Sequence, residues 1–195
     1  AVTTAEDLAP ALARADVLAC GPGLGTGAWG RRMLAAVQAA GRPLVLDADG
    51  LNLLAEAPPS RRADRVLTPH PGEAARLLGT GVGEVQGDRY AAAAELQARY
   101  GGVVVLKGAG TVVAGEGVPG VCPRGNPGMA SGGMGDLLTG IIAGLAAQRP
   151  GERLAEIAAL AVCLHGAAAD RAAAGGERGM LATDLLQPLR RLVNP

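Results

Sequence analysis

Phenylalanine is absent from the sequence, and aromatic residues make up only 2% of its 195 positions. Hydrophobic residues nevertheless account for 49% of the chain, so a large core can form, built from alanine, valine, leucine and isoleucine. The formal net charge is +0, which removes the electrostatic argument for a nucleic-acid partner or an anionic membrane surface. We therefore expect one domain over residues 1–195, with no nucleic acid and no membrane as partner.

Long apolar runs and closely spaced cysteines are also missing. A membrane-spanning helix needs about 18 consecutive apolar residues, and the sequence contains no such run and no visible signal peptide. Cys20, Cys122 and Cys163 are odd in number and too far apart for a metal-site spacing. We expect small, buried thiols in a reducing compartment, and hence a cytoplasmic protein.

Lysine is almost missing as well. Lys107 is the only lysine, and every other basic residue is an arginine. This usage could be chance. Alternatively, a compact ammonium group is required at this position and a planar guanidinium would not replace it, which makes Lys107 a candidate binding residue.

Short apolar runs alternate with segments of helical spacing along the whole chain. This alternation predicts an α/β fold in which a mostly parallel central sheet is covered by helices on both faces. The expected strands cover 16–20, 43–47, 65–68, 103–107, 111–114 and 118–122, and the expected helices cover 5–14, 28–41, 49–56, 71–79, 86–100, 135–148, 152–174 and 182–192.

The first four strands each end in an unusual loop. The loops begin with the sequences GPGLG, DADGLN, PHPGE and KGAGT, and all are rich in glycine, proline or polar residues. Ligands of open α/β sheets bind outside the carboxyl ends of the strands. Four such loops at one edge are stronger evidence for a binding site than any single loop.

A fifth loop, Gly125 to Asp136, is rich in glycine and runs directly into an apolar helical pattern. The first turn of a helix has unpaired N–H groups and the positive end of the helix dipole, so this loop predicts an anion site. Asp136 is then either the cap of the helix or a base that takes a proton from a hydroxyl group about to attack a phosphate.

The segment Gly125 to Gly144 resembles the signature of the NAD(P)H-hydrate dehydratases, a family of the ribokinase-like superfamily. The resemblance extends over nearly the whole chain from Asp16 onward. It implies a ribokinase-like, three-layer α/β/α fold. It also implies that the protein is an enzyme of the lyase class, a hydro-lyase. The reaction it implies is the ADP-dependent conversion of (6S)-hydrated NADH or NADPH to NAD(P)H, with AMP and phosphate as the other products. It also implies Mg²⁺ as cofactor and a homotetramer.

The resemblance also implies roles for individual residues. Asp136 would be the catalytic base. The hydrated dinucleotide would contact Gly25, Gly23, His70, Asp136 and Asn52, and ADP or AMP would contact Lys107, Gly108, Ala109, Gly110, Thr111 and Gly135. An anion hole would be formed by Gly132, Gly133 and Gly135, and no side chain would bind the metal directly, although Glu73 could do so through water.

Several of these residues have plainer alternatives. His70 could be a buried histidine with internal partners, and Glu73 a carboxylate in the first turn of a helix. Asp47, Asp49 and Asn52 could be the polar residues of a solvated turn, or could face the substrate or a magnesium-bound water. His165 and Asp170 lie on the apolar helix expected over 152–174. For them we expect packing and a capping or polar contact, and no direct function.

Two other functions are compatible with the sequence: a ribokinase-like small-molecule kinase, and an adenine-nucleotide-binding module without catalysis. The family's domain usually begins well before residue 16, and an epimerase domain is often fused to it. The resemblance therefore implies either a fragment or a short member of the family. An uncovered strand Val17–Cys20, apolar enough to be buried on both faces, would leave a sheet edge open to self-association.

Overall fold

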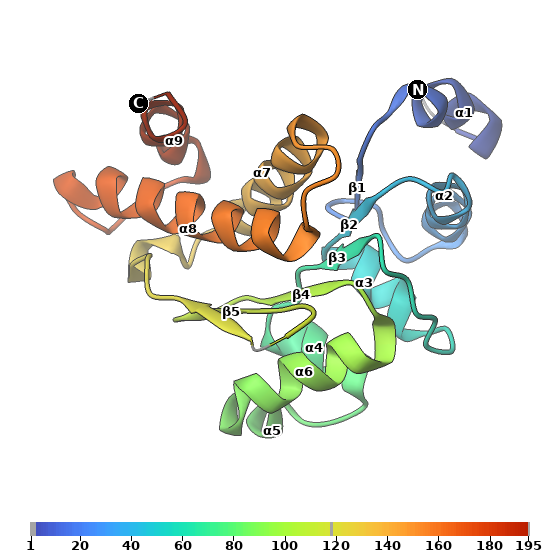
Figure 1. Cartoon of the computed structure of the whole chain (residues 1–195), viewed down its shortest axis with the longest axis horizontal. Coiled ribbons are helices and arrows are strands. Elements are labelled where there is room, and N and C mark those ends of the chain that lie inside the picture. The colour runs from blue at the N-terminus through green and yellow to red at the C-terminus, as the bar shows by residue number, and fades with distance from the viewer. Residues whose placement is uncertain (1–2, 118, 195) are drawn as a thin grey trace.

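A computed structural model describes residues 3–117 and 119–194 of the chain. Its centre is a six-stranded sheet in the order β1-β2-β3-β4-β5-β6 (Figure 1). The first four strands are parallel, and the last two are antiparallel to their neighbours, which confirms the mostly parallel sheet. The strands are β1 Leu18–Cys20, β2 Leu44–Leu46, β3 Arg65–Leu67, β4 Val103–Leu106, β5 Thr111–Ala114 and β6 Gly120–Cys122.

Helices cover both faces of the sheet, which completes the expected three layers (Figure 1). One face packs against α2 Ala28–Ala39, α3 Ala48–Ala55, α4 Pro71–Leu78, α5 Val82–Gly87 and α6 Arg89–Tyr100, with α1 Ala5–Arg14 at its margin. The other face packs against α7 Met134–Gln148 and α8 Leu154–Ala172, which α9 Leu186–Leu192 adjoins. Short 3₁₀ turns lie at Pro127–Met129, Ala173–Gly175 and Ala182–Leu185.

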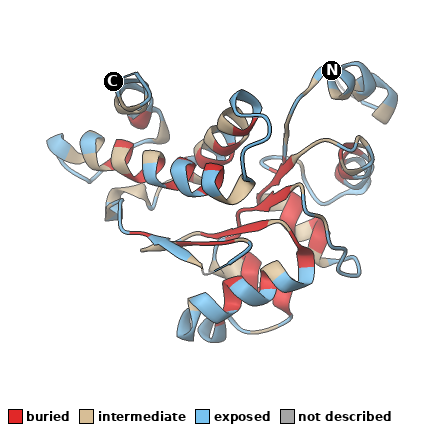
Figure 2. Ribbon diagram, viewed as in Figure 1, coloured by how far each residue is buried: buried red, intermediate tan, exposed pale blue. Residues whose placement is uncertain are grey.

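The core follows from the alternation of side chains along each strand. Leu44 and Leu46 of β2 point to the layer of α2 to α6, and Val45 points to the layer of α7 and α8. Parallel strands that are covered on both faces carry such unbroken apolar runs, and the interior strands are buried in Figure 2. Aliphatic residues and alanine form most of this core, with Tyr100 as a buried aromatic residue.

The structure refines the expectations for three elements. Strand β1 lies at the edge of the described sheet, in agreement with the uncovered strand expected at Val17–Cys20, and there Ala19 is exposed and Leu18 is half-buried. The helix expected over 86–100 is two helices, because Asp88 interrupts it and caps α6 by accepting a hydrogen bond from the amide of Ala91 (2.9 Å). The strand expected over 118–122 is β6, and position 118 lies outside the described residues.

Helix α8 and its 3₁₀ extension, Leu154–Gly175, are long and apolar enough to cross a membrane by length and composition. In the fold, however, 44% of the most apolar window is buried. Ala158, Ala161 and Val162 of this helix pack against the sheet and α7. One face of the helix is therefore covered by protein in this fold.

Candidate active site

Lys107 lies at the carboxyl end of β4 and is held by Asp47, which in turn is held by a residue of α7. Its Nζ is 2.7 Å from Oδ1 of Asp47, which directly follows β2 and is only 1% exposed. Thr139 of α7 donates a hydrogen bond from Oγ1 to the other carboxylate oxygen of Asp47 (2.9 Å). The only lysine of the chain is therefore fixed in position at the sheet edge where the sequence predicts a site.

The carboxylate of Asp47 is charged despite its burial. Burial by itself raises the pKa of Asp47, but the charge and hydrogen bond of Lys107, together with the hydroxyl group of Thr139, outweigh it and lower the pKa. Asp47 is thus an internal partner of Lys107 and Thr139, and the alternative of a solvated turn residue is wrong for this position.

The N-terminus of α7 meets Lys107 at Gly135. A Cβ atom at position 135 would lie 3.2 Å from Nζ of Lys107 and 3.5 Å from Oδ2 of Asp47, so a larger residue would crowd both groups. The helix begins after Gly133, which has a left-handed backbone (φ 84°) and no side chain to cap it. The unpaired N–H groups at the start of this 15-residue helix and the ammonium group of Lys107 therefore lie close together around Gly135. Such an arrangement of donors suits a phosphate group.

A cavity of about 750 Å³ opens beside this point. All six residues predicted to bind the nucleotide line it: Lys107, Gly108, Ala109, Gly110, Thr111 and Gly135. The facing wall comes from 123–127 and from α8, through Val162, His165 and Gly166. Gly132 and Gly133 are exposed and do not belong to the lining, so their part in an anion hole stays a prediction.

Two side chains that are distant in sequence brace the cavity walls. Arg89 donates hydrogen bonds to the carbonyls of residues 106, 107, 109 and 110, and so holds the turn after β4. Asp170 accepts hydrogen bonds from the amide of Gly125 (3.1 Å) and from Nδ2 of Asn126 (3.3 Å), which confirms its expected polar contact. The role of Arg89 was not visible in the sequence, because the loop it binds follows it by some twenty residues.

A separate polar network holds the loop after β1. The amide of Gly25 donates to Oδ2 of Asp49 (2.8 Å), and Nδ2 of Asn52 donates to Oδ1 of the same carboxylate (3.3 Å). Arg76 in turn binds Oδ1 of Asn52. Asp49 and Asn52 therefore organise the loop that carries Gly23 and Gly25, and none of these residues lines the 750 Å³ cavity. Their contact with a dinucleotide stays a prediction.

His70 caps helix α4 and is not a buried histidine. Its Nδ1 accepts hydrogen bonds from the amides of Gly72 (2.9 Å) and Glu73 (3.3 Å), while its side chain is 55% exposed. Glu73 completes the capping box by accepting from the amide of His70 (2.8 Å). Glu73 is thus a first-turn carboxylate, and its Oε2 also lies 3.9 Å from Nζ of Lys107. The contact between His70 and substrate stays a prediction.

Asp136 is the third residue of α7 and is exposed. It is not the cap of the helix, because Gly133 holds that position. Within the described part of the chain its carboxylate carries no hydrogen bond. Asp136 therefore lies next to Gly135 at the start of α7, and its role as a catalytic base stays a prediction.

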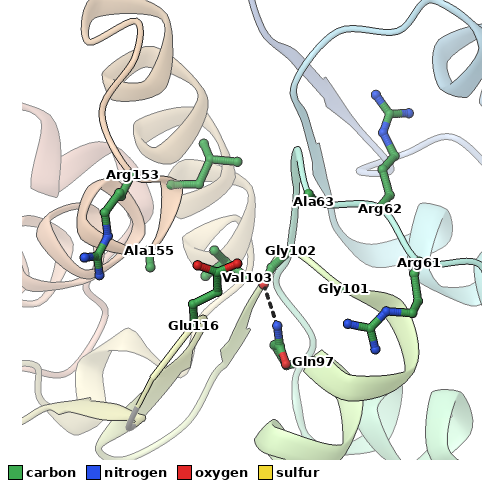
Figure 3. Close-up of a pocket in the computed structure, with 11 residues that line it drawn as sticks. Arg61, Arg62, Ala63, Gln97, Gly101, Gly102, Val103, Glu116, Arg153 and Ala155 are labelled. Carbon is green, nitrogen blue, oxygen red and sulfur yellow. Dashed lines mark hydrogen bonds between the residues drawn. The ribbon is translucent and has the colours of Figure 1, made fainter.

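A second cavity, of about 460 Å³, lies at the opposite edge of the sheet, at the start of β4 and α8. Figure 3 shows Arg153 on one side, Arg61 and Arg62 on the other, and Glu116 between them. Two of these arginines already have hydrogen-bond partners within the fold. Arg61 donates to the carbonyl of Ala98, and Arg62 donates to Asp64 and to backbone carbonyls. None of the predicted site residues lies there.

Comparisons with known proteins identify the family to which the chain is similar. A family model described as NAD(P)H-hydrate dehydratase matches residues 2–191. The chain is 57% identical to the bifunctional NAD(P)H-hydrate repair enzyme Nnr of Coxiella burnetii over 100% of its own length, and spans 40% of that relative.

Two solved structures have the same fold. One is a ribokinase-like superfamily protein of Enterococcus faecalis, at 33% identity and a TM-score of 0.85, with 96% of this chain and 66% of that chain covered. The other is the ADP/ATP-dependent NAD(P)H-hydrate dehydratase of Bacillus subtilis co-crystallised with ATP and Mg²⁺, at 35% identity and a TM-score of 0.80. The alignment covers 94% of this chain and 68% of the Bacillus chain. The match over nearly the entire length and the shared fold show that the chain belongs to the NAD(P)H-hydrate dehydratase family.

Proposed function

We propose that this chain carries the ADP-dependent dehydration of (6S)-hydrated NADH and NADPH. The proposal rests on the close approach of Lys107 to Gly135 at the start of α7. Both residues line a cavity that also contains every other predicted nucleotide-binding residue in its wall. Asp136 follows Gly135 directly and supplies a free carboxylate. The name of the Bacillus relative, an ADP/ATP-dependent NAD(P)H-hydrate dehydratase, supports the same chemistry.

In the proposed reaction a phosphoryl group moves from ADP to the hydroxyl group of the damaged nicotinamide ring. Asp136 accepts the proton of this hydroxyl group as the hydroxyl oxygen attacks the β-phosphorus of ADP, and AMP leaves. Lys107 and the N–H groups at the start of α7 stabilise the charge on the transferring group. The ring nitrogen then expels phosphate, which is a far better leaving group than hydroxide, and loss of the neighbouring ring proton restores NAD(P)H.

Magnesium fits this site as an ion that arrives with the nucleotide. Within the described residues no group of three or more His, Cys, Asp or Glu side chains could hold a metal ion. Mg²⁺ commonly keeps several waters and binds through phosphates and one or two carboxylates. Glu73 is the carboxylate that could bind such an ion through water, and the ion would offset phosphate charge beside Lys107.

Product analysis tests the proposal. The purified chain is incubated with ADP, Mg²⁺ and enzymatically hydrated NADPH, and both phosphate and reduced nicotinamide are measured. A dehydratase forms AMP, phosphate and NADPH in equal amounts. A kinase would leave a stable phosphoester without phosphate release, and a binding module would bind ADP without turnover; either result would contradict the proposal.

Arg89→Ala is expected to weaken ADP binding about tenfold, because the carbonyls that Arg89 binds belong to the turn lining the cavity. Calorimetric titration with ADP measures the effect. Arg99→Ala is the matched control, since Arg99 lies on the same helix and binds the carbonyl of Leu78, away from the cavity. Equal losses in both variants would show that α6 is merely loosened and that Arg89 has no special part in nucleotide binding.

We further propose that the protein is cytoplasmic and assembles as a homotetramer. The three thiols are free, as is usual for a reducing compartment, although Cys163 is exposed and not buried as the sequence led us to expect. Edge strand β1 leaves Ala19 exposed, which offers a surface for assembly. Light scattering on the purified chain measures the assembly, and a strictly monomeric particle with full dehydratase activity would contradict it.

A further inference from the structure

His165 lies in the middle of α8 and faces the nucleotide cavity. Its side chain is buried, with 6% of the residue exposed, and its Nε2 has no hydrogen-bond partner among the described residues. The polar contact expected for this residue from the sequence is therefore missing at this nitrogen. Buried imidazole nitrogens nearly always have partners, so an unpartnered one calls for an explanation.

The surroundings of His165 make it a neutral imidazole. Burial lowers its pKa to about 4, and the positive charge of Lys107 acts in the same direction. A neutral imidazole offers one N–H donor and one nitrogen acceptor. Val162 and Leu138, which line the same cavity, are apolar, so these neighbours supply no polar partner on that side.

The neighbourhood of His165 is otherwise closely organised. Gly166 lets the chain at Arg124 approach α8 so closely that a Cβ at position 166 would lie 2.7 Å from Cβ of Arg124. Asp170, on the same helix, holds the amide of Gly125. An apolar side chain would fill the place of His165 without leaving a nitrogen unpaired, so packing alone does not account for an imidazole here.

We infer that His165 binds the nucleotide co-substrate, through a hydrogen bond between its imidazole ring and the ribose or phosphate portion of ADP. The ribose and phosphates are favoured over the base because Lys107, the phosphate-binding candidate, lines the same cavity as the imidazole. The inference rests on the proposed function only in taking ADP as the ligand of this cavity.

Three variants separate this role from packing. His165→Leu removes both nitrogens, His165→Gln keeps a polar amide in place of the imidazole, and Leu160→Ala alters the exposed side of the same helix. We expect His165→Leu to raise the Kd for ADP about tenfold. Its melting temperature without nucleotide should stay the same or rise, because an unpaired buried nitrogen is removed. His165→Gln should retain most of the affinity.

The measurements are calorimetric titrations with ADP and Mg²⁺, and thermal unfolding without ligand, on the full chain. An unchanged Kd in His165→Leu overturns the inference. It is also overturned if Leu160→Ala weakens ADP as much as His165→Leu does, or if His165→Gln fails to restore binding to a folded protein. If the wild-type chain binds ADP but releases no phosphate from hydrated NADPH, the proposed function is contradicted. The role of His165 in ADP binding is still decided by the titrations, so the two failures can be told apart.

Discussion

Asp136→Asn is expected to lower the turnover of hydrated NADPH by about a hundredfold or more, while the fold and the affinity for ADP are kept. The asparagine has nearly the same shape but cannot take the proton from the attacking hydroxyl group. Asp136 is exposed on the first turn of α7 and is not its cap, so the substitution removes no hydrogen bond on which the helix depends. Single-turnover measurement of phosphate release reports the chemical step directly.

Glu156→Gln is the matched control for this prediction. Glu156 is also an exposed carboxylate in the first turn of an apolar helix, but α8 begins at the far edge of the sheet. Both substitutions remove one favourable interaction with a helix dipole, about 0.3–1 kcal/mol at the surface. If Asp136→Asn keeps near-normal turnover, as Glu156→Gln should, then Asp136 has no part in the mechanism.

The sheet could be predicted from the sequence because local patterns determine it. Val103–Leu106 is an unbroken apolar run between the glycine pair at 101–102 and the Lys107-Gly108 turn, and it forms a strand buried on both faces. The helix of Met134–Gln148 was equally visible, as an apolar helical pattern after a glycine loop. The edge position of Val17–Cys20 was expected from the family resemblance and not from composition, because an apolar run does not reveal whether a neighbouring strand lies beyond it.

The contacts that build the site were less visible, because the partners are far apart in sequence. Lys107 and Asp47 are separated by 60 positions, and Thr139 and Asp47 by 92. The lysine could be singled out by its rarity, but its partner depends on the register of β2, β3 and β4. One signal for Thr139 was available: it lies four positions after Gly135, on the same face of α7, as a polar residue in an apolar helix. His165 offered no such signal, since a histidine on an apolar helix is usually a core residue with partners.

Lys107→Ala is expected to weaken ADP much more than the hydrated dinucleotide, because Nζ lies beside Gly135 where the phosphates would bind. Lys107→Arg should rescue little of the loss, because a guanidinium is larger than an ammonium group and the space is already narrow. Nζ lies only 3.2 Å from the point that a Cβ atom at position 135 would occupy. Titrations with ADP and with the dinucleotide measure the two affinities separately.

The same substitution has a cost in stability that must be separated from binding. Without Lys107 the carboxylate of Asp47, only 1% exposed, loses its cation, and breaking such a buried pair costs about 3 kcal/mol. The pKa of Asp47, lowered in the wild type, should then rise above its unfolded value, because burial is opposed only by hydrogen bonds from hydroxyl groups such as that of Thr139. A group with a raised pKa favours the folded state in acid, so the stability difference from the wild type should shrink as the pH falls through that raised pKa.

The double variant Lys107→Ala, Asp47→Asn resolves the two effects. A neutral amide at position 47 can still accept a hydrogen bond from Thr139, so the double variant should regain most of the stability that Lys107→Ala loses. It should not regain affinity for ADP, because the ammonium group is still missing. Denaturant unfolding at neutral and acidic pH, combined with ADP titration, tests both statements. A folded double variant that binds ADP as tightly as the wild type would show that Lys107 serves only to neutralise Asp47.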